Sequence, residues 1–169
     1  LKKNSLLGND IAQSQDDIES FSRKIKTAVS AKVDPNFMVI ARIESLILEA
    51  GMDDALNRAK AYVLSGADGI MIHSREKTPD EVFHFSRLFR EIFPLIPLIC
   101  VPTSYNQIYE KELFENGFNV VIYANQLLRS AYPAMYKTAS SILEHERAYE
   151  ADKDLMSIQE ILNLIPGTV

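Results

Sequence analysis

Four short apolar segments recur along the middle of the chain, and each ends in polar residues. They span residues 36–45, 67–74, 97–104 and 119–125. Each segment is rich in Val and Ile, too short for a helix and apolar at consecutive positions, which is typical of strands buried on both faces. Amphipathic helical patterns lie between them with short connections, so the order predicts parallel βαβ units with right-handed crossovers.

The residues that flank the predicted helices indicate where these helices begin and end. Gly66 and Gly117 each follow a helical pattern, and a glycine at that position favours a left-handed stop. Thr78 precedes another helix and Glu81 follows three residues later, a spacing that predicts a capping box. Further helices are predicted over 15–30, 126–150 and 154–164.

This alternation places the chain in the α/β class and leaves two architectures open. One is a small open sheet of four strands. The other is part of a (β/α)8 barrel, which typically needs about 250 residues. The chain has 169 residues, the length of one ordinary domain. In both architectures, ligands bind at the carboxyl ends of the strands.

Polar residues follow all four predicted strands, at the ends where ligands would bind. They are Arg42, Glu44, His73, Ser74, Thr103, Ser104 and Asn125. The guanidinium of Arg42 offers a fork of donors for a carboxylate or phosphate, but it can equally pair with Glu44, which shares its face of the strand. His73 fits a general acid or base, a phosphate donor, a metal ligand or a buried core histidine.

Other chemically capable residues have simpler interpretations. His84, His145 and Arg58 lie on predicted helices, and we expect them at the surface. The single cysteine, Cys100, sits in an apolar segment and is expected to be a buried core thiol. Two acid pairs fall in first turns of predicted helices, where carboxylates stabilise the helix dipole. The sequence therefore predicts no metal site within this chain.

Composition and charge narrow the functional classes. The residues are 47% hydrophobic and 24% charged, as in globular proteins. The net charge is −5 and no basic stripe is present, which argues against nucleic acid as a partner. No apolar run reaches the roughly 18 residues of a membrane span, and no signal peptide is evident. We therefore expect no membrane association and a cytoplasmic location.

Six sequence motifs are distinctive. The most specific are "KKNSLLG", "ARIES" and "GADGIMIHS", and the others are "VPTSYNQ", "VVIYANQLLRSAYPAM" and "DKDLMSIQEILNL". Together they resemble the later half of the phosphoenolpyruvate mutase family, within the isocitrate lyase/phosphoenolpyruvate mutase superfamily. The resemblance implies the second half of a (β/α)8 TIM-type barrel, with the N-terminal barrel half absent from this chain. The expected layout is one partial domain, with a lid-loop remnant over 1–14, βα units over 15–125 and C-terminal helices over 126–169.

The family interconverts phosphoenolpyruvate and phosphonopyruvate in phosphonate biosynthesis, so the resemblance implies an isomerase with a small-molecule substrate. It implies that Arg42 and His73 hold the phosphoryl oxygens while Asn4 reaches them from a closed lid, with Ser5 and Lys2 as further substrate contacts. It also implies Mg²⁺, with its ligands in the absent half, and therefore an inactive fragment. Supporting positions around the site are expected at Glu44, Thr103 and Asn125. A homodimer or homotetramer is expected, with a C-terminal helix packed on a partner's barrel.

Three alternatives stay open at this point. Phosphonopyruvate hydrolases resemble the mutases but tend to carry Thr where Asn4 stands, so Asn4 favours the mutase. The superfamily's lyases carry a catalytic cysteine in a KKCGH-type lid, whereas "KKNS" has none, which disfavours a lyase. The chain also fits a non-catalytic half-barrel interaction module or an inert fragment. Some family members continue into a nucleotidyltransferase domain, which would begin after Val169.

Overall fold

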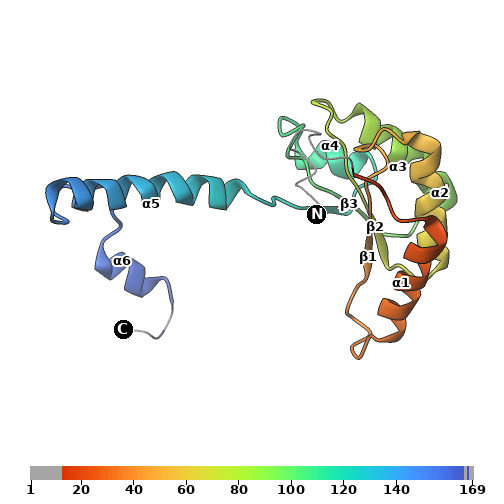
Figure 1. Cartoon of the computed structure of the whole chain (residues 1–169), viewed down its shortest axis with the longest axis horizontal. Helices are drawn as coiled ribbons and strands as arrows, with labels where there is room; N and C mark the ends of the chain where they lie inside the picture. The colour runs from red at the N-terminus through yellow and green to blue at the C-terminus, as the bar shows by residue number, and fades with distance from the viewer. Residues whose placement is uncertain (1–12, 166, 168–169) are drawn as a thin grey trace. The chain divides into compact units, whose positions relative to one another are not determined.

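The computed structural model describes residues 13–165 and residue 167. The chain divides into two compact units, Leu1–Ala124 and Asn125–Val169 (Figure 1). The expected lid residues Lys2, Asn4 and Ser5 lie outside the described residues.

The first unit alternates helices and strands as predicted. Its helices are α1 (Ile18–Ser30), α2 (Gly51–Leu64), α3 (Asp80–Ile92) and α4 (Glu110–Glu115). Its strands are β1 (Ile40–Ile43), β2 (Gly69–Ile72), β3 (Leu98–Cys100) and β4 (Val120–Val121). They form one parallel sheet in the order β1-β2-β3-β4. Each strand therefore pairs with the strand that precedes it, as expected of consecutive βαβ units.

Two of the predicted helix ends are confirmed and one predicted start is wrong. Gly66 and Gly117 have φ of 98° and 90°, the left-handed conformation expected after α2 and α4. Thr78 does not cap α3, because its hydroxyl donates to the Asp80 carboxylate at 2.7 Å. The capping box also fails because the Glu81 carboxylate accepts from Ser74 instead.

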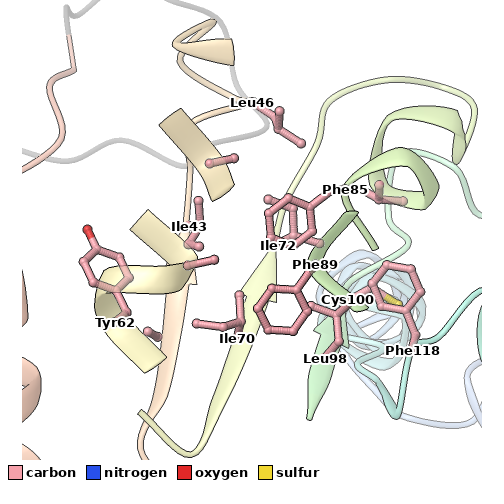
Figure 2. Close-up of a cluster of buried hydrophobic side chains, with 14 of the residues drawn as sticks. Ile43, Leu46, Tyr62, Ile70, Ile72, Phe85, Phe89, Leu98, Cys100 and Phe118 are labelled. Carbon is pink, nitrogen blue, oxygen red and sulfur yellow. The ribbon is translucent and has the colours of Figure 1, made fainter. Parts of the chain in front are cut away.

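Alternate residues of the strands build the core of this unit. Ala41, Ile43, Ile70, Ile72, Leu98 and Cys100 are buried in one hydrophobic cluster. Phe85 and Phe89 of α3 and Tyr62 of α2 pack into the same cluster, as Figure 2 shows. Because successive strand residues point to opposite faces, Arg42, Met71 and Ile99 belong to the other face of the sheet.

At the amino edge of the sheet, an acidic residue ties the starts of β1 and β2 together. The Asp68 carboxylate accepts a hydrogen bond from the Val39 amide at 2.7 Å. It also pairs with Lys32 at 3.0 Å, just after α1. The Asp68 amide in turn donates to the Val39 carbonyl at 2.9 Å. One side chain thus secures two strand starts and the end of a helix.

At the same edge, Arg90 connects the starts of β3 and β4 through hydrogen bonds. Its guanidinium donates to the carbonyl oxygens of Ile96 at 2.7 Å and of Gly117 at 3.0 Å, and also to the Asn119 side chain. The Asn119 side-chain oxygen also accepts from the Leu98 amide at 2.9 Å. A single cation therefore satisfies backbone carbonyls from both turns that lead into these strands.

The second unit consists of helices with exposed apolar side chains. It contains α5 (Gln126–His145), a 3-10 turn η1 (Asp152–Asp154) and α6 (Ile158–Asn163). Lys137 of α5 pairs with Asp154 at 2.7 Å, and Ser157 and Glu160 form a capping box at the start of α6. Exposed large apolar residues of α5 include Leu127, Leu128, Tyr132, Met135, Tyr136 and Leu143. No helix in the described part of the chain is long and apolar enough to cross a membrane.

Candidate active site

The carboxyl edge of the sheet brings Arg42 and His73 onto one face. In the register of β1 and β2, Arg42 lies opposite Met71. His73 follows Met71 by two residues and therefore continues the same face, opposite the core. Continuing this register by two residues would bring Glu44 opposite His73. The predicted convergence of these side chains at a strand end thus has a direct basis in the pairing of β1 and β2.

Arg42 and Glu44 form an ion pair on this face. Arg42 Nη2 lies 2.7 Å from Glu44 Oε1. The Arg42 side chain is 41% exposed, whereas that of Glu44 is 11% exposed. Because the Glu44 carboxylate is nearly buried, its ion pair orients the Arg42 guanidinium. Solvent can still reach the Arg42 side chain. The Arg42–Glu44 ion pair, which the sequence left open, is therefore present. It is compatible with anion binding by Arg42.

His73 directly follows β2 and is buried, at 4% exposure. The next residue, Ser74, is 1% exposed, and its hydroxyl donates a short hydrogen bond to the Glu81 carboxylate in the first turn of α3. The same hydroxyl oxygen accepts from the Glu76 amide at 3.0 Å. The Ser74 hydroxyl therefore makes two hydrogen bonds, one to the Glu81 carboxylate and one from the Glu76 amide, and together they fix the backbone next to His73.

A comparable network fixes the end of β1. Ser45 is fully buried and donates to Asp54 Oδ2 at 2.7 Å. The same oxygen accepts from Gln15 at 3.1 Å and from Arg58 Nε at 2.9 Å. Partial burial of the Asp54 carboxyl tends to raise its pKa, but the bonds from Ser45, Arg58 and Gln15 outweigh burial and lower the pKa below its ordinary value.

Arg58 corrects one sequence-based expectation. We expected a surface arginine, but its side chain is 11% exposed. It pairs with Asp54 and donates to the Asp16 carbonyl at 2.8 Å and the Tyr62 hydroxyl at 3.0 Å. Arg58 therefore links the segment before α1 to α2 and is unsuitable as a neutral control. The expectations for His84 and His145 are confirmed, since both are exposed.

Two further predicted site residues, Thr103 and Asn125, follow β3 and β4. Thr103 is half-buried in the turn after β3, and its amide donates to the Val101 carbonyl at 2.8 Å. Asn125 precedes α5 as its N-cap residue and belongs to the second unit. The supporting roles expected for Thr103 and Asn125 therefore stay predictions.

Sequence reasoning missed the roles of Ser45, Ser74, Asp54 and Glu81. A usable signal was present, because a serine directly follows Glu44 and another directly follows His73. An acidic residue then occurs in the first turn of the helix that follows each serine. Two acids adjoin at the start of each helix, however, and their spacing alone does not reveal which one reaches the strand end.

The described residues do not form a magnesium site on their own. No group of three His, Cys, Asp or Glu side chains within residues 13–165 could hold a metal ion. Magnesium requires several oxygen ligands. At the end of β1 the Glu44 carboxylate is paired with Arg42. Cys100 is fully buried, as predicted, and burial raises the pKa of its thiol to about 12, which suits a core residue.

The family model for phosphoenolpyruvate phosphomutase matches residues 4–143. The chain belongs to the phosphoenolpyruvate phosphomutase family. A member with a different named activity, the phosphonopyruvate hydrolase of Variovorax sp. (strain Pal2), is 38% identical over 163 residues, which is 96% of this chain and 55% of the hydrolase. The chain spans about half the length of the curated relatives it matches.

Solved structures of this family agree with the fold. A crystal structure of phosphoenolpyruvate phosphomutase from Streptomyces platensis subsp. rosaceus superposes with a TM-score of 0.86 at 34% identity, over 96% of this chain and 55% of that one. A phosphonopyruvate hydrolase in complex with oxalate and Mg²⁺ gives 0.80 at 38% identity, over 92% and 54%. The predicted α/β fold of four parallel strands with helices is confirmed, and it aligns with about half of a family barrel.

Within the phosphoenolpyruvate phosphomutase family, mutases and hydrolases are similarly related to this chain. Both groups act on small phosphonate or phosphate-bearing acids, as their names state. The comparisons therefore show the family and leave the exact reaction to be decided by experiment.

Proposed function

We propose that this chain supplies the phosphoryl-binding half of a phosphoenolpyruvate mutase, an isomerase that interconverts phosphoenolpyruvate and phosphonopyruvate. The observation that carries the proposal is the placement of Arg42 and His73. Arg42 is oriented by a nearly buried carboxylate, and His73 continues the same face of the sheet at its carboxyl edge. Barrel enzymes bind their substrates at this edge.

The chemistry of the reaction matches these side chains. In one direction a phosphorus–oxygen bond of phosphoenolpyruvate breaks and a phosphorus–carbon bond forms, so no atom is gained or lost. The migrating group carries its negative charge on three oxygens, and positioned donors stabilise it best in a site from which water is excluded. In this proposal the Arg42 guanidinium binds two of these oxygens, His73 donates to the third, and Glu44 orients Arg42.

The proposal assigns further parts of the site to segments outside the described residues. Asn4 contributes a side-chain amide from the lid, with Ser5 and Lys2 beside it. Mg²⁺ would neutralise charge on the pyruvate enolate when bound, with ligands on strands that this chain lacks. Those strands complete the barrel in the proposed enzyme, and the 169 residues alone are inactive.

Phosphonopyruvate hydrolysis is the second candidate, favoured by the 38% identity to a hydrolase. The two reactions differ in the fate of the same phosphoryl group, which passes either to the enolate oxygen or to water. Asn4 supports the mutase, because its amide can donate to the group while its length keeps the lid closed. A shorter, β-branched Thr would leave room for water.

The exposed apolar side chains of α5 support the expected homodimer or homotetramer. An apolar surface of this kind normally contacts another protein surface. In the proposal, α5 packs on the barrel of a partner. Sedimentation of the purified protein measures the oligomer directly, and a monomer at all concentrations would remove this part of the proposal.

The test uses the protein expressed from its complete reading frame, supplied with phosphonopyruvate and Mg²⁺. Phosphorus NMR separates phosphonopyruvate, phosphoenolpyruvate and inorganic phosphate in one spectrum. We expect phosphoenolpyruvate as the main product, and release of phosphate as the main product would replace the mutase with the hydrolase. The variant Asn4→Thr should shift products towards phosphate, while the exposed Asn36→Thr should not. An unchanged ratio in Asn4→Thr would remove Asn4 from its role.

A further inference from the structure

The same construction occurs at the ends of β1 and β2. In each case a candidate site residue is followed by a buried serine, as Glu44 is by Ser45 and His73 by Ser74. Each serine donates its hydroxyl hydrogen to a carboxylate in the first turn of the next helix. The sequence separations differ, so this is a repeated three-dimensional arrangement and not a sequence repeat.

The two serines lie in an environment where such a bond matters. Ser45 and Ser74 are 0% and 1% exposed, so water does not compete for their hydroxyl groups. A hydrogen bond to a carboxylate is about twice as strong as a bond between neutral groups. Each bond joins a residue two positions after a strand to the first turn of the next helix. The backbone between the strand and the serine is therefore held at both ends.

We infer that Asp54 and Glu81 are positioning residues for the candidate active site, acting through Ser45 and Ser74 respectively. This inference rests on the proposed function for its kinetic test. Asp54 fixes the backbone next to Glu44, which orients Arg42. Glu81 fixes the backbone next to His73. Neither acid needs to touch the substrate to affect the reaction, because small displacements of donors from a transition state are costly.

Each acid has a matched control directly before it in the sequence. Asp53 precedes Asp54 and is exposed. Asp80 precedes Glu81, and its carboxylate accepts from Thr78, which does not adjoin a site residue. A general effect of charge at a helix start would appear equally in the control and in the positioning residue. An effect through the serine would appear in the positioning residue alone.

The kinetic test compares Glu81→Ala, Glu81→Gln and Asp80→Ala in the protein from its complete reading frame. We expect Glu81→Ala to lower kcat about 10- to 100-fold while KM changes less than about threefold. Glu81→Gln should restore most of the activity, because its amide oxygen still accepts from Ser74. Asp80→Ala should stay within about twofold of wild type. Equal losses in Glu81→Ala and Asp80→Ala would overturn the inference.

A double-mutant cycle tests whether Glu81 acts through Ser74. If it does, Ser74→Ala lowers kcat by itself, and adding Glu81→Ala lowers kcat by less than about twofold more. Losses that simply multiply would show that Glu81 acts by another route and would overturn the inference. Circular dichroism melting of each variant separates loss of fold from loss of positioning, and Glu81→Gln serves where Glu81→Ala does not fold.

A second measurement does not depend on the enzymatic reaction. In an NMR spectrum of nitrogen-15-labelled protein from the complete reading frame, the ring signals of His73 can be assigned as those that disappear in the variant His73→Gln. Glu81→Ala should move and broaden the His73 signals, whereas Asp80→Ala should leave them in place. Unchanged His73 signals in Glu81→Ala would overturn the inference. An inactive wild-type protein would instead overturn the proposed function and leave this measurement to decide.

Discussion

The two edges of the sheet use their charged side chains in different ways. At the amino edge, Asp68 and Arg90 bind backbone amides and carbonyls of the turns that lead into the strands. At the carboxyl edge, the Arg42 guanidinium pairs with another side chain and stays accessible to solvent. Backbone groups need partners wherever they are buried, so the amino-edge contacts serve folding. A side-chain pair that solvent reaches can exchange part of its contacts for a ligand.

This difference has a practical meaning for mutagenesis. Substitution of Arg42 should lower catalytic activity, whereas substitution of Arg90 should lower the stability of the fold. The second unit cannot supply this contrast, because no residue of its long helix α5 is buried.

Loss of Arg42 should give the largest effect, and it should appear in activity. We expect Arg42→Ala to lower kcat/KM at least about 100-fold, equivalent to roughly 3 kcal/mol, because a phosphoryl-binding cation is removed. The free energy of unfolding should change by less than about 1 kcal/mol. The control is Arg87→Ala, at an exposed position of α3. Comparable activity in both variants would remove Arg42 from the site.

Loss of Arg90 should give a somewhat smaller effect, and it should appear in stability. Arg90→Ala leaves the Ile96 and Gly117 carbonyls without their charged donor, which should lower the free energy of unfolding by about 2–3 kcal/mol. Urea denaturation measures this loss. Arg90→Lys should recover only part of it, because one ammonium cannot reproduce the planar fork of a guanidinium. An Arg90→Ala protein as stable as wild type would contradict the proposal that the charged side chains of the amino edge serve folding.

The smallest effect concerns the pH dependence of stability at Asp68. The bond from the Val39 amide and the pairing with Lys32 lower the pKa of Asp68 below its ordinary value of 3.8, against a smaller opposing effect of burial. A lowered folded-state pKa stabilises the fold above the unfolded pKa, and this contribution is lost as the pH falls through the folded pKa.

Asp68→Asn should therefore cost about 1 kcal/mol near neutral pH and progressively less as the pH falls below about 4. Urea denaturation at several pH values measures the difference between wild type and variant. The exposed Asp53→Asn serves as the control at the start of α2. A difference that stays constant down to pH ~2 would contradict the assigned role of the Asp68 charge.

Much of the first unit could be predicted from the sequence because its signals are local. Continuous apolar segments identified the four strands, and Gly66 and Gly117 marked helix ends through a backbone conformation that glycine favours. The predicted capping box failed for a tertiary reason. Glu81 had the required spacing from Thr78, but a buried serine from the preceding strand end competes successfully for its carboxylate.

The candidate site was predictable in part. The positions of Arg42 and His73 follow from strand ends, and the Arg42–Glu44 pair follows from the two-residue period of a strand. The environment of Arg58 was predicted wrongly, although its spacing of four residues from both Asp54 and Tyr62 was a usable hint. Gln15 and Ser45 could not have been added, because they reach Asp54 from other elements of the fold.

The strand order β1-β2-β3-β4 also bears on how the sheet assembles during synthesis. The paired residues Ile40 and Gly69 are 29 positions apart, and Ile99 and Val120 are 21 apart. Because each strand pairs with its immediate predecessor, no strand must wait for a distant later segment before it finds a neighbour. Short sequence separations favour rapid folding, and segments near the amino terminus leave the ribosome first. These four strands can therefore pair one after another in the order of translation.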